Sequence, residues 1–304
     1  MSNSASNLDE AVALLNADAD FKVLKRVPEQ FDTLPAVGAE QFKAAIIDLE
    51  TTGLSAEQDE IIEIGTLIVT FNIEQGISSV VFSDNQLQQP EKPITEEITA
   101  ITGITNEDVA GKSIDWPLLM DALKDVHLVI CHNARFDRQF LELQTPGEVS
   151  ELFQRKAFGC SASDVSWRQL GFEGAKLEYL NLKMGYFYDG HRALVDCWAT
   201  MNLFIQKPEA FELLKESVRQ KQRLICAVNA DFDKKDLLKA RGYRWSSGDR
   251  NLPKSWYTVV NEADVEDEMT YLNETIYEGR NVPLPQQVVN AYNRYSPREY
   301  RLEK

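Results

Sequence analysis

A strongly apolar stretch at residues 42–49 leads into two carboxylates and a turn, and this combination limits the folds open to the chain. Asp48 and Glu50 close the stretch and are followed by two threonines and Gly53. Apolar and β-branched residues in such a run are typical of a central strand. Side chains two residues apart project from the same side of a strand, so the two acids can converge on one cation. The stretch therefore predicts a strand that ends either in a metal site or in solvated acids, and both readings remain open at this point.

Further apolar stretches alternate with helical patterns up to residue 206. Strands are expected at 61–71 and 127–131, with a shorter one at 79–82, and Gly65 would permit close packing on the strand at 61–71. Helices are expected at 94–109, 116–126, 135–143 and 193–205, with Gly103 as a cap in the first and Asp115 before the second. The segment 147–182 is expected to be mostly helical, with a turn-rich interruption at 159–167. This alternation predicts an α/β fold with a mixed central sheet flanked by helices.

The two ends of the chain differ from this central part. Residues 1–40 carry a helical pattern broken by Pro28 and Pro35, which predicts an N-terminal helical extension that packs on the core. A break at Lys207–Glu209 separates the central domain, 41–208, from residues 209–304. There a strand, a helix, two paired strands and an acidic helix at 263–277 predict a small α+β module of uncertain role.

Two later segments repeat the design of the first. Residues 128–137 join an apolar stretch to a polar turn and then Asp137, and residues 190–196 place His191 five positions before Asp196. In this order, the patterns Asp-x-Glu-Thr-Thr-Gly, His-Asn-Ala-x-Phe-Asp and His-x-Ala-x-x-Asp resemble the three signature motifs of the DEDDh, or DnaQ-like, 3′→5′ exonucleases. That family includes the epsilon proofreading subunit of bacterial DNA polymerase III. Three spaced motifs over about residues 43–206 are a specific signal, whereas each alone would be weak.

The resemblance implies an RNase H-like fold and a two-metal site. Its ligands would be Asp48, Glu50, Asp137 and Asp196, holding two Mg²⁺ ions that Mn²⁺ can replace, with Asp48 bridging both. Magnesium prefers oxygen ligands of this kind. His191 would be the general base. Five residues on an ideal helix rotate about 140° away from one another, so we expect His191 on the loop before the helix that carries Asp196.

The resemblance also implies a pocket for the terminal nucleotide. Its walls would come from Thr51, Thr52, Leu54, Ile104 and Phe136, and Asn133 would touch the next phosphate or sugar. Hydroxyls, backbone donors and apolar stacking can hold a strand end. Ordinary turn and core roles are equally open for these six residues.

Several conspicuous side chains favour structural roles. His132 is expected to cap the turn or orient Asn133, and Glu63 and Asp59 to be solvated or salt-bridged. Apolar surroundings and the absence of a CxxC spacing favour reduced core thiols for the cysteines over zinc ligands or disulfides. Trp167 and Trp198 are expected in the core. The cysteines are Cys131, Cys160, Cys197 and Cys226.

Composition gives information about the binding partners and the cellular location of the protein. A net charge of −16 is the reverse of the usual footprint of a nucleic-acid binder, but an enzyme that grips only a strand end needs few phosphate contacts. Divalent cations held by its acids also supply positive charge that the sequence does not show. The chain has no apolar run of membrane-spanning length and no signal-peptide pattern, which predicts a cytoplasmic protein without membrane association.

Three functions are compatible with these features. The leading hypothesis is a 3′→5′ exonuclease that acts on single-stranded or frayed DNA ends in proofreading, repair or end processing, with a polymerase or repair protein as a possible partner. An exoribonuclease with the same chemistry is the alternative, because the motifs do not read the 2′-hydroxyl. A nuclease-fold scaffold is disfavoured, since all four acids and the histidine are present. Basic and aromatic residues at 234–257 would suit single strands, with a solvated helix face as the competing account.

Overall fold

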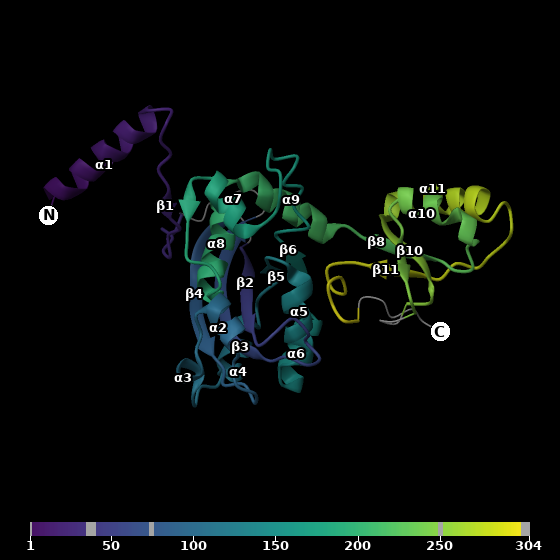
Figure 1. The fold of residues 1–304 in the computed structure, drawn as a ribbon, viewed down its shortest axis with the longest axis horizontal. Coiled ribbons are helices and arrows are strands. Elements are labelled where there is room, and N and C mark those ends of the chain that lie inside the picture. Colours follow the sequence, from purple (N-terminus) through teal and green to yellow (C-terminus); the bar gives the residue numbers. More distant parts are fainter. Residues whose placement is uncertain (1, 35–40, 73–75, 249–251, 299–304) are drawn as a thin grey trace.

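The computed structural model describes residues 2–34, 41–72, 76–248 and 252–298. A five-stranded sheet forms the larger body of the molecule, and a four-stranded sheet forms a smaller body beside it (Figure 1). Within the described ranges, no helix combines the length and the apolar character needed to cross a membrane.

The larger sheet is mixed, as expected for the α/β class. Its order is β4 (Gly76–Leu87), β3 (Ile61–Asn72), β2 (Phe42–Thr51), β5 (Leu128–Cys131) and β6 (Ala157–Cys160). The first three strands are antiparallel to one another, whereas β5 runs parallel to β2 and β6 parallel to β5. The apolar stretch that precedes Asp48 is therefore the central strand, as its sequence predicts.

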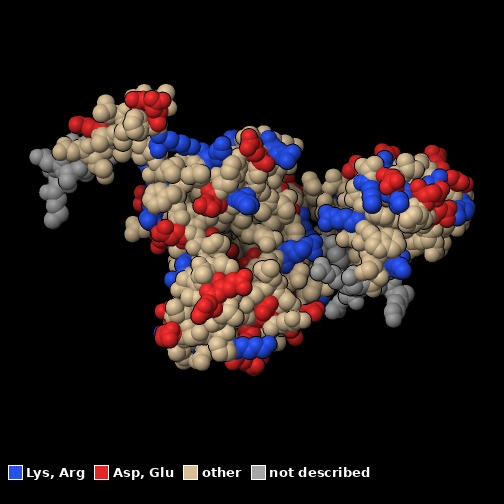
Figure 2. Space-filling view, in the orientation of Figure 1, with Lys and Arg blue, Asp and Glu red and all other residues tan. Residues whose placement is uncertain are grey.

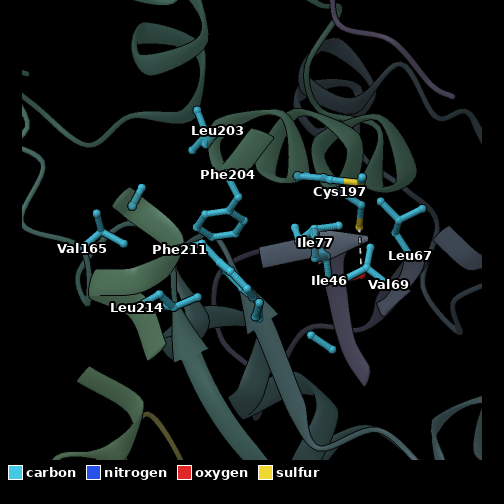
Figure 3. Close-up of a cluster of buried hydrophobic side chains, with 14 of the residues drawn as sticks. Ile46, Leu67, Val69, Ile77, Val165, Cys197, Leu203, Phe204, Phe211 and Leu214 are labelled. Carbon is cyan, nitrogen blue, oxygen red and sulfur yellow. Dashed lines mark hydrogen bonds between the residues drawn. The ribbon is translucent and has the colours of Figure 1, made fainter. Parts of the chain in front are cut away.

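Helices cover both faces of this sheet. Side chains of α7 (Leu177–Lys183), α8 (Ala193–Gln206) and α9 (Pro208–Arg219) pack with Ile46 and Leu67 in one buried cluster (Figure 3). Side chains of α4 (Trp116–Leu123), α5 (Ala134–Leu143) and α6 (Gly147–Gln154) pack with Ala45 and Ile47 in another. Neighbouring residues of β2 thus face opposite clusters, which explains why the strand is apolar on both sides.

Local signals set several helix ends where the sequence predicts them. Asp115 caps α4 by accepting from the Leu118 amide at 3.0 Å, and a proline occupies the first turn. Gly103 ends α2 (Glu96–Thr102) with a φ of 71°, so the single helix expected over 94–109 is instead two, with α3 at Asn106–Val109.

Two expectations about strands were wrong. The strand expected at 79–82 extends over the whole of β4, residues 76–87. Within 147–182, which was expected to be mostly helical, β6 is a fully buried edge strand of four residues that begins before the turn-rich interruption expected at 159–167. Short apolar runs of this length do not separate strand from helix by periodicity, which accounts for the error.

The N-terminal extension is helical, but its helix does not pack on the core as expected. The exposed fractions of Leu8 and Leu14 in α1 (Ser2–Ala17) are 67% and 75%, and α1 projects away from the larger body (Figure 1). Contact is made further along, where β1 (Lys25–Arg26) pairs with β7 (Tyr186–Phe187) and Val27 is buried. An apolar helical pattern does not by itself specify what covers it.

The smaller body contains the β-α-β-β-α order expected for the C-terminal region, followed by one further strand. Its antiparallel sheet has the order β11 (Gln286–Val289), β8 (Gln222–Ala227), β10 (Ser255–Asn261) and β9 (Arg244–Ser246). A short η1 (Phe232–Lys234) leads into α10 (Lys235–Ala240). The acidic helix expected at 263–277 is η2 (Glu262–Asp264), α11 (Val265–Tyr271) and a π-helical turn labelled η3 (Leu272–Ile276). We call residues 221–289 the C-terminal module.

Both ends of the C-terminal module continue into segments that pack on the larger body. Phe211 and Leu214 of α9 belong to the same buried cluster as Ile46. Residues 290–298, here called the strap, return to the larger body, where the buried Arg138 guanidinium donates to the carbonyls of Ala291, Tyr292 and Arg294. The division at residue 208 stays a prediction; in space, α9 and the strap lie with the larger sheet.

Candidate active site

Asp48 and Glu50 lie near the end of β2, the central strand of the larger sheet. Asp48 is opposite Gly65 and Glu50 opposite Glu63 on β3, and the pairing shifts register directly after Glu50. One carboxylate oxygen each from Asp48, Glu50 and Asp196 lie within 4.8 Å of one another. The two acids of the first motif and the acid of the third therefore meet in one cluster.

A glycine allows α8 to deliver Asp196 to this cluster. A Cβ atom added to Gly65 would lie 2.3 Å from the Ala193 carbonyl carbon and 2.4 Å from the Leu194 nitrogen. The first turn of α8 thus lies directly against the β3 backbone, beside the pair of Asp48 and Gly65. The close packing expected at Gly65 is confirmed, and it places the start of α8 next to β2.

His191 lies on the loop before α8, as the helix geometry predicts. Its φ is 64° and its side chain is exposed. The backbone amides of His191 and Arg192 donate to Asp196 Oδ2 at 2.8 and 3.2 Å, so the loop is held over the carboxylate. A pocket of about 460 Å³ opens here, lined by His191, Asp196 and Tyr188 together with Lys176, Leu177, Glu178 and Gly190.

Asp137 approaches from the other face of the sheet. It lies in the first turn of α5 with 2% of its surface exposed. Burial raises the pKa of Asp137 to about 8, although hydrogen bonds from the backbone amides of Asp137 and Leu49 oppose the shift. The bond from Leu49, between Asp48 and Glu50, ties the acid of the second motif to the strand of the first.

The pKa values of all four carboxylates are raised. Burial first, then the charges of Asp137 and Asp196, raise the pKa of Asp48 well above its usual range. Burial and then Asp196 raise the pKa of Glu50 to about 8, and burial raises that of Asp196 to about 6. Crowded carboxylates of this kind favour either bound protons or a cation. The donor set, all oxygen and negatively charged, fits a divalent cation such as Mg²⁺.

Glu63 lies buried beside the cluster and forms an ion pair with Arg192, a partner that the sequence did not identify. Glu63 is fully buried; it pairs with Arg192 at 2.7 Å and accepts from the Ala193 amide at 2.9 Å. The salt-bridging role expected for Glu63 is confirmed, and the solvated role is not. The pair fixes the start of α8 to β3. Tyr188 was also missed, although its hydroxyl hydrogen-bonds Asp196.

The residues expected around the terminal nucleotide differ in how far their side chains are exposed. Leu54 is 88% exposed and Asn133, with a φ of 90°, is exposed just before α5. Thr51 and Thr52 use their hydroxyls within the turn, Thr51 donating to the Gly53 carbonyl and Thr52 accepting from the Glu60 amide. Phe136 is partly buried against Phe140, with ring centroids 4.9 Å apart.

Ile104 is not presented to a ligand. It is 1% exposed and packs with Ile62, Ile94 and Val109 in a separate small cluster. The structure thus presents Leu54 and Asn133 to solvent and keeps the Ile104 side chain in the interior.

The core positions expected for the cysteines and tryptophans are confirmed, whereas His132 has a structural role other than the two expected for it. His132 hydrogen-bonds Ser161 Oγ at 2.7 Å and the Ala175 carbonyl at 2.8 Å, rather than orienting Asn133, and burial lowers its pKa to about 4. All four cysteines are buried and free, and Trp167 and Trp198 are in the core.

Comparison with known proteins agrees with this arrangement. Residues 45–204 match the model of a family described as Exonuclease. The chain belongs to this exonuclease family. The resemblance to the DEDDh exonucleases, based on the three motifs, is therefore confirmed, and the match covers β2, α5 and α8, which carry the four acids.

Individual proteins are similar to about half of the chain. The DNA polymerase III subunit epsilon of Treponema pallidum is 30% identical over 165 residues, which cover 52% of this chain and 72% of that protein. The PolC-type DNA polymerase III of Thermotoga maritima is 32% identical over 164 residues, and the chain spans only 11% of its length. A solved structure of exonuclease X with 5′-overhanging duplex DNA is 22% identical, covers 57% of this chain and 98% of that one, and has a TM-score of 0.42.

Proposed function

We propose that the chain is a metal-dependent 3′→5′ exonuclease that removes nucleotides from single-stranded or frayed ends of DNA. The observation that carries the proposal is the cluster of Asp48, Glu50 and Asp196, whose oxygens lie within 4.8 Å of one another beside a loop histidine. Membership of the exonuclease family supports nucleic-acid hydrolysis. The preference for DNA is inferred from relatives that are named as DNA polymerase III subunits.

In this proposal the four acids hold two divalent cations, Mg²⁺ or Mn²⁺. Asp48 is central because it lies on the middle strand and feels the charges of Asp137, Asp196 and Glu50. When bound, the ions supply positive charge to the phosphoryl oxygens and lower the pKa of the attacking water. The chain itself fixes the ligands: Leu49 holds Asp137, and the backbone amides of residues 191 and 192 hold Asp196.

His191 is proposed to take the proton from the attacking water. An imidazole changes protonation near neutral pH, which suits a general base. The loop keeps the His191 side chain exposed while its own amide stays bonded to Asp196, so the base can reach the substrate without displacing that carboxylate. Leu54 and Asn133, both exposed, are proposed to contact the last nucleotides, with Thr51 and Thr52 shaping the turn and Phe136 supporting it.

The test is degradation of a 5′-labelled oligonucleotide with Mg²⁺ or Mn²⁺. The wild-type protein should shorten it stepwise from the 3′ end and release mononucleotides, and a chelator should stop the reaction. Asp48→Asn should lower the rate at least roughly 10⁴-fold, the size of loss seen when one member of a catalytic unit is removed. Matched DNA and RNA substrates distinguish the proposed activity from that of an exoribonuclease.

A matched control is Glu151→Gln, which removes an exposed acid that pairs with Arg155 on α6. This variant should keep wild-type activity. Degradation that survives Asp48→Asn, or a wild-type protein inactive on both DNA and RNA with either metal, would refute the proposal.

A further inference from the structure

Two lysines of the C-terminal module lie between aromatic side chains. Lys235 lies over the Phe232 ring at 4.1 Å, and Lys239 follows four residues later on α10, on the same face of the helix. Lys239 lies 5.8 Å from the centre of the Trp256 ring, and Trp256 packs edge-on against Trp245 with centroids 5.5 Å apart. We call these five residues the aromatic–lysine row. It connects η1, α10, β10 and the edge strand β9.

The ends of the row are open to solvent. Phe232 is 81% exposed and Trp245 is 51% exposed, whereas Trp256 is partly buried against the core of the module. Several exposed large aromatic side chains in one patch are typical of a binding surface, whereas single exposed ones are common on any protein. The C-terminal module has a core of its own, made by Ile225, Leu238 and Tyr277 among others, which does not need Phe232 or Trp245.

The lysines of the row differ from other cations close by. Lys234 pairs with Glu278, and Arg241 pairs with Glu268 at 2.9 Å. No carboxylate in the described part of the chain lies within ion-pair distance of Lys235 or Lys239. Their ammonium groups are thus available to an anionic ligand that also offers flat surfaces to the rings.

Charge along the chain favours the same end of the molecule. Residues 1–220 carry 35 acidic and 18 basic side chains, whereas residues 221–289, the C-terminal module, carry 11 acidic and 10 basic ones. Basic and acidic groups are interspersed over the visible face of the C-terminal module (Figure 2). A nucleic-acid strand whose 3′ end lies on the acidic larger body would meet a nearly neutral surface on the C-terminal module. Lys235 and Lys239 are available to it on that surface.

We propose that the aromatic–lysine row binds single-stranded nucleic acid, with bases stacked on Phe232 and Trp245 and phosphates paired with Lys235 and Lys239. Flat rings reach bases only when these are unpaired, which favours a single strand over a duplex. The row lies outside residues 45–204, which match the exonuclease family, so it would be a second contact for the strand whose end the active site hydrolyses. This inference rests on the proposed function for the identity of its ligand.

The experiment measures binding of fluorescent oligothymidylate and oligouridylate to the full chain by anisotropy in chelator, where no hydrolysis occurs. Phe232→Ala combined with Trp245→Ala should weaken binding at least about tenfold, because two stacking contacts are lost together. Lys235→Glu combined with Lys239→Glu should weaken it similarly and reduce its dependence on salt. The two oligonucleotides show whether the row prefers DNA or RNA.

Matched controls separate the row from general effects. Phe21→Ala removes an aromatic ring that is 56% exposed outside the row, and Lys112→Glu reverses an exposed charge on the larger body; both should leave binding unchanged. The Lys235→Glu and Lys239→Glu exchange does not touch the core, so it remains informative if the aromatic variant fails to fold.

Hydrolysis of the p-nitrophenyl ester of thymidine 5′-phosphate separates this proposal from the first. The ester is too small to reach both sites, so row variants should hydrolyse it at the wild-type rate. An inactive wild-type protein would count against the proposed exonuclease function. The role of the row would be overturned if the wild-type protein is active and the row variants bind both oligonucleotides with unchanged affinity. This result is also the one expected if the row binds a protein partner instead.

Discussion

Among the described residues, the larger body with α9 and the strap buries six charged side chains, whereas the C-terminal module buries one, Glu268. In the larger body, Asp137, Arg138, Glu142 and Glu63 are all at most 6% exposed. In the C-terminal module, the pair of Arg280 and Asp231 lies at the surface, with side chains 51% and 52% exposed. Buried charges demand fixed partners, whereas exposed pairs contribute little to stability and are easily rearranged. The larger body is therefore built to hold charges in fixed positions, as a metal site requires.

The strap shows how the two regions are joined. Residues 290–298 come after the C-terminal module in sequence but bury their contacts in the larger body: Glu142 accepts from Ser296 Oγ at 2.7 Å and from Arg298 Nε at 2.9 Å. With α9 on one side and the strap on the other, the C-terminal module is anchored at both ends. The helix that receives the strap, α5, also carries Asp137. Loss of the strap would therefore disturb both the junction and the candidate site.

The largest effect on this comparison is expected from Arg138→Met. Arg138 is fully buried, pairs with Glu142 at 2.7 Å and donates to three strap carbonyls. Removal of one partner from a buried ion pair leaves a buried charge and typically costs about 3–5 kcal/mol. We expect a loss of that size in denaturant unfolding, with faster hydrogen exchange in residues 290–298.

Arg155→Met is the matched control for Arg138→Met, because Arg155 makes an exposed pair with Glu151 four residues away in sequence. Its loss should be below about 1 kcal/mol. If the two substitutions had equal effects, the buried and exposed pairs would not differ as described, and the strap would be held by other contacts.

Acid should destabilise the larger body through His132. All three histidines of the chain lie in the first 200 residues, and burial lowers the pKa of His132 from 6.5 to about 4. Between these values the unfolded chain binds the proton and the folded protein does not, so stability falls as pH is lowered from about 6.5 to about 4 and is fully present above that range. The contribution approaches roughly 3 kcal/mol at the acid end.

His132→Gln should remove this slope from the pH profile of unfolding, and hydrogen exchange should place the change at residues 161 and 175, which contact the ring. His127→Gln, at an exposed imidazole, is the matched control and should leave the profile as it is. The raised pKa values of Glu50, Asp137 and Asp196 give both proteins an opposite slope over this range, so the test is the difference between the wild-type and variant profiles. A difference that does not change with pH would contradict the assignment.

The sequence predicts the parts of this molecule that depend on neighbouring residues. The central strand, the cap at Asp115 and the loop position of His191 follow from periodicity, turn chemistry and helix geometry over short distances. The grouping of Asp48, Glu50 and Asp196 followed from the spaced motifs, which carry family information that local patterns lack.

Features that join distant segments were not predictable in the same way. Glu63 and Arg192 are separated by 129 residues, and Arg138 is separated from its strap partners by 153–156. The burial of Ile104 and the exposure of α1 likewise depend on which surfaces meet, and a single sequence does not specify that. The short strand β6 was missed because four apolar residues fit either kind of element.

A smaller, more selective effect is expected from Gly65→Ala. The added methyl group would overlap the backbone of Ala193 and Leu194, so α8 must move away from β3 and take Asp196 with it. Overpacking of this kind costs about 1–3 kcal/mol, but the displaced carboxylate should lower the exonuclease rate by more than the stability change suggests. The matched control, Gly147→Ala, meets open space at the start of α6 and should leave stability and rate close to wild type.

Binding of oligothymidylate in chelator should be unchanged in Gly65→Ala, because the aromatic–lysine row lies in the C-terminal module, whose sheet is separate from the sheet that contains β3. The two regions would then be separable, with ligand geometry in the larger body and strand binding in the C-terminal module. A Gly65→Ala protein that keeps full activity would show that α8 can shift without moving Asp196 relative to Asp48. A Gly65→Ala protein that also loses oligonucleotide binding would show that the two regions respond as a single unit. The anchoring of the C-terminal module at both ends would explain such a result.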